Sequence, residues 1–423
     1  MTRALALVDG EHYPAVVRDA LAELPYEVAG AVLLGGTEKL RGDPDYGVPL
    51  YSSLTEGLAR SGAEVVLDLS DEPVVDARRR FRLASEALAA GRPYVGADFR
   101  LDPVPFAPFE LPSLAVIGTG KRVGKTAVAG HVARLLSVWC EVVVVAMGRG
   151  GPAEPAVVEV PPGLADLLAL SRAGEHAASD YLEDAALARV VTVGCRRCGG
   201  GLAGRPFASN VESGARLAAA LAPDLVVFEG SGSVMPPIAT DRRILVASAR
   251  QGPEAVTGYL GAYRLLLSDL VVLTMCETPG AAGRLRGAIA EVAPELAVVA
   301  TTLRPRPVAP VAGRCVAFFT TAQEAAHPIL RDHLEREHGA EIVLVSGNLA
   351  RRDALRADLA SAEARTADVW LVELKAAAID VVAETADERG VEVVLSDNAV
   401  VPLDGQPDLD GLLRELAPVE AKA

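Results

Sequence analysis

The sequence predicts an α/β fold built on a mostly parallel central sheet, with a smaller α/β unit toward each end of the chain. Two observations indicate this fold: short apolar runs alternate with segments of helical period, and two proline-rich stretches interrupt the alternation. The 423 residues, 50% hydrophobic and 23% charged, suffice for two to four domains with separate cores. We expect an N-terminal α/β domain at 1–110, a core domain at 111–308 and a C-terminal α/β domain at 309–423.

The first hundred residues alternate strands with helices, as in a βαβ unit. Strands are expected at Ala4–Val8, Val28–Leu34 and Val65–Leu69, and helices at Ala15–Leu24 and Arg78–Leu88. Polar stretches, "LVDGEHYP" (7–14) and "LLGGTEKLRG" (33–42), end the first two strands and indicate either a binding edge or ordinary turns. Four prolines mark 102–112 as a linker.

The pattern restarts at Leu114 as strand, glycine loop and helix, and a continuous apolar strand of the buried parallel kind follows. Strands are expected at Leu114–Ile117, Val142–Met147, Leu225–Phe228, Ile244–Ala247 and Leu270–Met275, and helices at 124–138, 211–221 and 253–267. A second proline cluster, at 305–310, ends this region. Further strands are expected at Cys315–Phe319, Ile342–Val345, Val369–Glu373 and Val391–Leu395.

The loop "GTGKRVGKTAV" (118–128) holds two of only five lysines, in a chain that uses arginine 36 times. In phosphate-binding loops, glycines let backbone N–H groups converge on an anion and a lysine reaches the terminal phosphates, where arginine's planar fork fits poorly. Gly124, Lys125 and Thr126 suit these roles, so we expect a P-loop NTPase-like core that binds ATP. The residues assigned to the nucleotide are Gly118, Thr119, Gly120, Lys121, Arg122, Val123, Gly124, Lys125, Thr126 and Ala127.

The match to the usual loop pattern is imperfect, because Thr119 stands where that pattern has glycine. The spacing instead resembles the loop of dethiobiotin synthetases and related ATPases, which runs Gly-Thr, four variable residues, then Gly-Lys-Thr. A glycine turn without a ligand is the alternative. The coincidence of strand, Gly-Lys-Thr triplet and helix favours nucleotide binding.

An acidic residue at the end of a later strand is expected to serve the same nucleotide. In "PDLVVFEGSGS" (223–233) an apolar strand ends in Glu229, where it can hold Mg²⁺ directly or through water, with the Thr126 hydroxyl as another ligand. A surface carboxylate is the alternative. Related ATPases often place an Asp at the end of the strand after the phosphate loop, but this chain has "MGRGGPAEP" (147–155) there, so a third metal contact is left open, with Glu154 a weak substitute.

Arginines within glycine-rich stretches indicate a phosphorylated substrate. Arg149 lies in the turn just named, and "GCRRCGGGLAGRP" (194–206) carries Arg196, Arg197 and Arg205 on what we expect to be flexible loops. Solvated surface is the alternative for each. Cys195 and Cys198 have no second ligand pair at zinc spacing, so they are interpreted as small loop residues.

The net charge of −15 disfavours nucleic acid and anionic membranes as partners, so a polyanionic substrate needs a local basic pocket. No apolar run approaches the roughly 18 residues of a membrane helix, and five cysteines without a secretory pattern indicate reduced thiols. We expect a cytoplasmic protein with small-molecule partners. A homodimer is compatible with the sequence but not indicated by it.

Three stretches together, "ALVDGEHYP", "GTGKRVGKTAV" and "DLVVFEGSGS", resemble the cyclic 2,3-diphosphoglycerate synthetases, and the resemblance runs over most of the chain. It implies a ligase that uses ATP and Mg²⁺ to close 2,3-diphosphoglycerate into an internal phosphoanhydride, releasing ADP and phosphate. Lys125, Thr126 and Glu229 carry over by motif. We assign catalysis to Lys125, Glu229, Arg196 and Arg197, and substrate binding to Arg149, Arg196, Arg197 and Arg205.

Two other functions stay open from the sequence. A ligase like dethiobiotin synthetase would phosphorylate a carboxylate or carbamate, and its ATP turnover would respond to a carboxylated amine. A regulatory P-loop ATPase would control a partner protein and form no small-molecule product.

Overall fold

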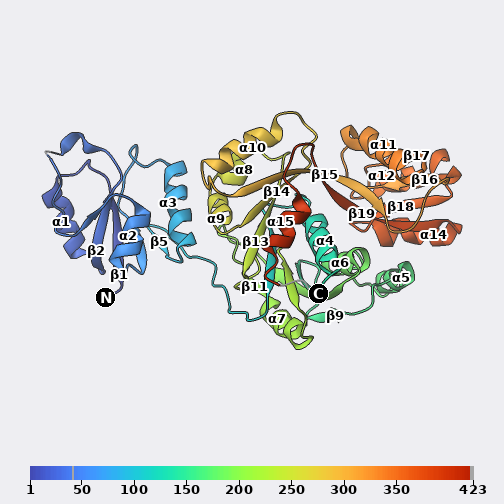
Figure 1. Ribbon diagram of the computed structural model, residues 1–423, viewed down its shortest axis with the longest axis horizontal. Helices are drawn as coiled ribbons and strands as arrows, with labels where there is room; N and C mark the ends of the chain where they lie inside the picture. The colour runs from blue at the N-terminus through green and yellow to red at the C-terminus, as the bar shows by residue number, and fades with distance from the viewer. Residues whose placement is uncertain (41, 420–423) are drawn as a thin grey trace.

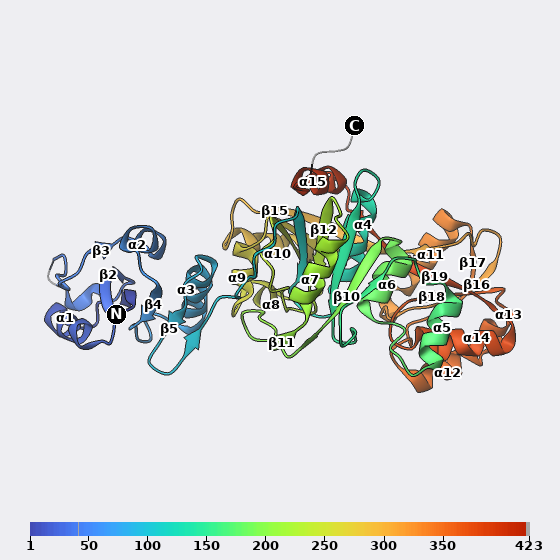
Figure 2. The same ribbon diagram turned by 90° about the horizontal axis from the view of Figure 1, so that it is seen from below.

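The computed structural model describes residues 1–40 and 42–419, and Figures 1 and 2 show their arrangement. The described residues form a six-stranded sheet near the N-terminus and a 13-stranded sheet through the rest of the chain. The prediction of a mixed α/β fold with a large, mostly parallel sheet is confirmed. Among the described residues, none of the helices combines the length and apolar character needed to span a bilayer.

The N-terminal sheet has the strand order β3-β2-β1-β4-β5-β6 and is parallel except for its last pair. Its strands are β1 (Arg3–Val8), β2 (Glu27–Leu33), β3 (Leu50–Tyr51), β4 (Val65–Asp68), β5 (Tyr94–Val95) and β6 (Arg100–Leu101). Its helices are α1 (Pro14–Glu23), η1 (Thr37–Lys39), α2 (Leu54–Ser61) and α3 (Ala77–Ala89). Helix α3 packs on α9 of the next unit, with Phe81 edge-on to Tyr259 at 5.6 Å between ring centroids.

The central strands run in the order β11-β10-β8-β12-β7-β13-β14-β15, with β9 beside β10. The strands are β7 (Ser113–Gly118), β8 (Val142–Gly148), β9 (Ala156–Val158), β10 (Val191–Cys198), β11 (Ala208–Ser209), β12 (Leu225–Glu229), β13 (Arg242–Ser248), β14 (Leu270–Thr274) and β15 (Ala297–Pro307). The helices are α4 (Lys125–Leu136), α5 (Leu164–Arg172), α6 (Asp180–Ala188), α7 (Val211–Ala220), α8 (Pro253–Thr257), α9 (Gly261–Leu266) and α10 (Ala281–Ala290).

The C-terminal strands continue the same sheet in the order β19-β18-β16-β17. They are β16 (Cys315–Phe319), β17 (Glu341–Ser346), β18 (Val369–Glu373) and β19 (Glu392–Pro402). The helices are η2 (Glu324–Ala326), α11 (His327–His338), α12 (Arg352–Leu359), α13 (Ala362–Thr366), η3 (Ala378–Ala383), α14 (Glu384–Arg389) and α15 (Leu409–Leu416). The last of these helices, α15, packs back on α4 of the central unit. Residues 420–423 of the predicted C-terminal domain lie outside the described part.

The junction between β15 and β19 decides how the two halves of the large sheet face each other. Residues 297–300 of β15 pair in parallel with β14, whereas residues 301–307 pair antiparallel with residues 396–402 of β19. Strands β18, β16 and β17 are parallel to β19, so they run opposite to the central strands. The C-terminal strands therefore point their carboxyl ends back toward the carboxyl ends of the central strands (Figure 1).

Two elements differ from the sequence prediction. The helix expected over 253–267 is two short helices, α8 and α9, because the chain turns at Gly258 and Tyr259, whose φ is +45°. A Cβ at Gly258 would also lie 2.4 Å from the Glu254 carbonyl oxygen. The stretch expected to be a flexible loop around Arg196 and Arg197 is instead the end of strand β10. Glycine and the two arginines within "VTVGCRRC" hid its strand character.

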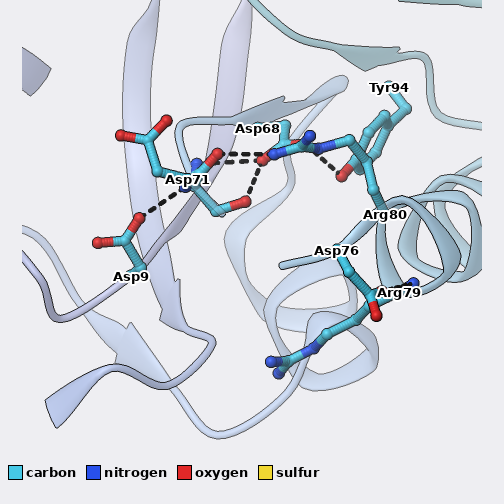
Figure 3. Close-up of polar contacts among 8 residues, drawn as sticks. Asp9, Asp68, Asp71, Asp76, Arg79, Arg80 and Tyr94 are labelled. Carbon is cyan, nitrogen blue, oxygen red and sulfur yellow. Dashed lines mark hydrogen bonds and ion pairs between the residues drawn. The ribbon is translucent and has the colours of Figure 1, made fainter. Parts of the chain in front are cut away.

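The polar ends of the N-terminal strands lie side by side as expected, since β1 pairs with β2 and Gly10 N donates to the Gly35 carbonyl at 2.7 Å. Their carboxylates hold the turns in place (Figure 3). Asp9 accepts hydrogen bonds from the backbone of Glu11 at 2.9 Å and of Asp71 at 2.7 Å. A binding role for this edge stays a prediction.

Buried Asp68, at the end of β4, is the centre of the N-terminal network in Figure 3. Its Oδ2 accepts from Arg80 Nε at 2.7 Å and from the Tyr94 hydroxyl at 2.8 Å. We expect Asp68→Asn to lower the free energy of unfolding by about 1–3 kcal/mol, because Arg80 and Tyr94 lose a charged acceptor. Urea unfolding with hydrogen exchange over residues 1–100 would measure the change.

Asp71→Asn is the matched control, because the network uses the backbone N–H of Asp71. It should leave the unfolding free energy within about 0.5 kcal/mol of the parent. Equal losses in the two variants would contradict the role given to Asp68.

Candidate active site

The glycine loop between β7 and α4 is held by residues of β14 and β15 and by the segment after β13. Gly124 has φ +82°, and a Cβ there would lie 2.9 Å from Leu303 Cδ1, so this position requires glycine. The Thr274 hydroxyl donates to the Val123 carbonyl oxygen at 2.6 Å. The Thr119 hydroxyl donates to Gln251 Oε1, also at 2.6 Å. Thr119, the departure from the usual loop pattern, therefore fixes the loop to the segment after β13.

Lys125 and Glu229 meet at the carboxyl ends of adjacent parallel strands, although they lie 104 residues apart in the chain. Lys125 Nζ donates to Glu229 Oε1 at 2.6 Å, and the two side chains are 8% and 1% exposed. Burial acts to lower the pKa of Lys125, but Glu229 and Asp180 raise it above its ordinary value, so the side chain stays an ammonium ion. The structure thus brings together the two residues that the sequence analysis assigned to catalysis by motif.

Helix α6 adds acidic residues to this pair that the sequence analysis missed. Burial and then Glu229 raise the pKa values of Asp180 and Asp184. Burial raises the pKa of Glu183 to about 8, against the opposing effect of Lys375. Only the position of α6 in the fold reveals this cluster, since nothing in "SDYLEDAAL" marks it as buried beside a lysine.

Asp180 stands near the strand end where related ATPases have an aspartate. A Cβ at Gly148, the last residue of β8, would lie 3.1 Å from Asp180 Oδ2. Glu154, the substitute considered from the sequence, is exposed and does not line the cavity described below. The carboxylate near this strand end therefore comes from the first turn of α6.

The side chains around Lys125 can be compared with the ligands that Mg²⁺ requires. In residues 1–40 and 42–419, no three His, Cys, Asp or Glu side chains converge as a metal site. Magnesium in phosphate-transfer sites, however, takes few protein ligands and completes its shell with phosphates and water. Glu229 Oε2 is buried and has no hydrogen-bond partner among the described residues. The Thr126 hydroxyl lies on the cavity wall and the Glu229 carboxylate is buried behind Lys125 and beside Asp184, so the chemistry of these two side chains fits a magnesium ion that is brought with a nucleotide.

A cavity of about 680 Å³ opens in front of the loop, between the central strands and the C-terminal strands. One wall contains residues 120–126 and Arg149, and the other contains Thr321, Gln323 and Lys375. Six cationic side chains line it: Lys121, Arg122, Lys125, Arg149, Arg250 and Lys375. Four acidic side chains also line it, namely Asp180, Glu183, Glu277 and Glu373, so cationic groups outnumber acidic groups in this cavity of a chain with a net charge of −15.

The arginines assigned to the substrate are not all brought to this cavity. Arg149 lines it, whereas Arg196 and Arg205 are exposed outside it. Arg197 is buried, and its Nη2 donates to the Ser231 carbonyl at 2.9 Å while Nη1 donates to the Gly199 carbonyl at 2.8 Å. Because side chains alternate along β10, Arg196 and Arg197 cannot act as a pair.

Lys375, just after β18, is a cavity residue that the sequence analysis did not select. The signal was present, because lysine is rare in this chain and this one follows an apolar strand directly. Three of the five lysines, Lys121, Lys125 and Lys375, line the same cavity. The scarcity of lysine therefore points to the same cavity from two separate parts of the chain.

The raised pKa of Glu183 gives a pH dependence of stability. The folded chain keeps this proton up to about pH 8, whereas an unfolded glutamate loses it near pH 4.3. Folding therefore holds an extra proton between these values, and stability falls as the pH rises through this window. We expect the stability of Glu183→Gln relative to the parent to increase by up to about 1.4 kcal/mol per pH unit from pH 5 to 8.

Chemical unfolding of both proteins at a series of pH values measures this difference. Glu212→Gln, at an exposed position in the first turn of α7, serves as control. Parallel pH profiles for Glu183→Gln and the parent would contradict the burial argument.

Comparison with known families agrees with the site geometry. Three family models match successive parts of the chain: the N-terminal domain of cyclic 2,3-diphosphoglycerate synthetase over residues 3–102, its P-loop domain over 113–302 and its C-terminal domain over 307–399. The domain boundaries predicted from the sequence stay a prediction.

Curated relatives match over nearly the whole chain. The cyclic 2,3-diphosphoglycerate synthetase of Rubrobacter xylanophilus is 51% identical over 434 residues, covering 98% of this chain and 97% of the relative. That of Thermococcus kodakarensis is 44% identical, covering 95% of each chain. That of Methanothermus fervidus is 42% identical, covering 95% of this chain and 94% of the relative. The chain therefore belongs to the cyclic 2,3-diphosphoglycerate synthetase family.

Proposed function

We propose that this protein is an ATP-dependent ligase that closes 2,3-diphosphoglycerate into cyclic 2,3-diphosphoglycerate, with ADP and phosphate released. Membership of the family supports the reaction. The observation that carries the proposal is the cavity of about 680 Å³, which places the phosphate loop opposite a second wall with a cation of its own. This arrangement provides for two phosphorylated ligands, a nucleotide and a second substrate.

The terminal phosphates of ATP bind to the loop 118–127 in this proposal, at the positive end of α4. Lys125 is held by Glu229 at 2.6 Å, so an arriving phosphate competes with this carboxylate for the ammonium group. Glu229 would then be free to hold Mg²⁺ together with the Thr126 hydroxyl. When bound, the ion would supply positive charge that offsets the charge of the phosphates.

The second substrate brings phosphates that repel those of ATP and each other. Each pair of unit charges about 4 Å apart costs roughly 4 kcal/mol at an effective dielectric constant near 20. Arg149 and the other cations of the cavity offset this repulsion. Roles in substrate binding for Arg196, Arg197 and Arg205 stay predictions, and for Arg197 the hydrogen bonds to Ser231 favour a positioning role.

We further propose a stepwise reaction. An oxygen of one substrate phosphate attacks the γ-phosphorus of ATP, and the bond to ADP breaks. An oxygen of the neighbouring substrate phosphate then attacks the activated phosphorus and displaces the transferred phosphoryl group as inorganic phosphate. The second attack is intramolecular and gains from proximity, by up to about 7–11 kcal/mol in well-aligned cases. No side-chain nucleophile is needed, so the protein contributes positioning and charge stabilisation.

The other functions considered from the sequence receive less support. A dethiobiotin-like ligase or a regulatory ATPase accounts for the loop but not for the match of all three family models along the chain. The charge of −15 supports the further proposals of a cytoplasmic protein without nucleic acid partners. A homodimer is a hypothesis that light scattering would decide.

Incubation with ATP, Mg²⁺ and 2,3-diphosphoglycerate should give a cyclic anhydride in phosphorus NMR, together with ADP and phosphate in equal amounts. With γ-phosphate labelled by ¹⁸O, the stepwise route predicts positional isotope exchange that depends on the substrate. ATP turnover that responds to a carboxylated amine but not to the bisphosphate would exclude the proposed reaction. Absence of exchange would exclude only the stepwise order.

Replacing Lys125 should reduce turnover by at least about 10²-fold, because a charge contact to the transferring phosphoryl group is lost. Lys125→Met alone would leave Glu229 buried without its partner, so the informative variant is Lys125→Met combined with Glu229→Gln, which keeps the volume and removes both charges. Arg216→Ala, on the exposed face of α7, is the control. Undiminished ATP binding and turnover in the double variant would remove the loop from the site.

A further inference from the structure

We propose that Lys375 binds a phosphate group of the non-nucleotide substrate. This substrate would then lie between the phosphate loop and the carboxyl ends of β16 and β18. This inference rests on the proposed function and names the residue that holds the second substrate. Lys375 is assigned here as a substrate-binding residue, distinct from Lys125, which we assign to the nucleotide.

The topology of the C-terminal strands selects this place. The chain passes from β16 to β17 on one side and then returns to β18 on the other, so the strand order switches between β16 and β18. In parallel α/β sheets, ligands bind in the crevice outside the carboxyl ends of the strands at such a switch point. Thr321 and Lys375 follow these two strands closely, and both line the cavity.

The backbone after β18 is bent to present Lys375 to the cavity. Lys375 N donates to the Glu373 carbonyl oxygen at 2.7 Å, which closes a tight turn. The next residue, Ala376, has φ +47°, a conformation uncommon for residues other than glycine, and it also lines the cavity. Such local strain is retained where the surrounding structure requires it, and it is concentrated at ligand sites.

Glu373, the acidic residue on this wall, is held by hydrogen bonds of its own, although its charge also acts on Lys375. Glu373 Oε2 accepts hydrogen bonds from the Thr321 backbone at 2.9 Å and from its hydroxyl at 3.1 Å, and Oε1 accepts from Asn398 at 3.2 Å. These bonds tie the ends of β16, β18 and β19 together. The carboxylate of Glu373 is thus engaged in the frame of the wall.

Among the described residues, Lys375 forms its ion pair with Glu183 of α6, and the contact is long. Lys375 Nζ lies 3.6 Å from Glu183 Oε1, longer than the contact between Lys125 and Glu229, and the Lys375 side chain is 33% exposed. Lys375 lines the cavity and its contact with Glu183 is long. Its ammonium group can therefore donate hydrogen bonds to a phosphate oxygen. Both lysines line the same cavity as Asp180 and Glu183 of α6.

The test measures each substrate separately in Lys375→Met. We expect the KM for 2,3-diphosphoglycerate to rise by about 10- to 100-fold, as for loss of a charge-assisted hydrogen bond, while the Kd for ATP changes by less than about twofold. Lys375→Arg should recover part of the affinity, since it keeps the charge. Equal weakening of both substrates, or an unchanged KM for 2,3-diphosphoglycerate, would overturn the proposal.

A purely structural ion pair is the competing explanation, and Lys375→Met combined with Glu183→Gln separates the two. The double variant removes the ammonium group together with the carboxyl group that faces it, so it should regain the thermal stability of the parent but keep the raised KM. Recovery of the parent KM would show that Lys375 serves only the fold.

Failure of the proposed function is distinguishable from failure of this inference. If the parent protein forms no cyclic product, calorimetric binding of 2,3-diphosphoglycerate to the parent and to Lys375→Met still decides the role of Lys375. Weaker binding to the variant would support it, and equal or absent binding would overturn it.

Discussion

The antiparallel pairing of β15 with β19 is the constraint on which the site depends. A sheet that stayed parallel throughout would direct all its carboxyl ends to one edge, and one surface would carry every loop. Here residues 301–307 of β15 leave the central sheet and pair with residues 396–402 of β19, which runs the other way. The central part and the C-terminal part of the 13-stranded sheet are thereby joined with the carboxyl ends of their strands face to face. The cavity lies between these two edges.

This junction also connects the phosphate loop physically to the opposite wall. Asp397 of β19 lies 2.6 Å from Arg134 of α4, the helix that follows the loop, and 2.9 Å from Arg306 of β15. The side chain of Asp397 is 7% exposed, so these contacts lie in a poorly hydrated environment where charge pairs are strong. A change in the position of α4 on nucleotide binding would therefore alter the contact between Arg134 and Asp397 of β19, beside the wall that carries Lys375.

The charges at the site are arranged so that a strongly acidic protein can receive polyphosphates. Glu229 pairs with Lys125, and Glu183 of α6 faces Lys375. Burial raises the pKa of Glu183 to about 8. The cost of burying like charges is thus limited by protonation and by lysine pairing. In the proposed function, a phosphate that enters takes the place of a carboxylate beside a lysine, so the lysine is not left as an isolated buried cation.

The sequence by itself determined the α/β class, the phosphate loop, the acid Glu229 at the end of a later strand, and the family. These features depend on local patterns: strand followed by glycine loop and helix fixes where N–H groups point, whatever surrounds them. Tertiary structure alone decided that β19 pairs antiparallel with β15, that Asp180 takes the place near the end of β8, and that Lys375 lines the cavity opposite Lys125. It also separated Arg196 from Arg197, because strand β10 turns neighbouring side chains to opposite faces. Contacts between residues hundreds of positions apart follow from strand order and direction, and no local run of residues records these.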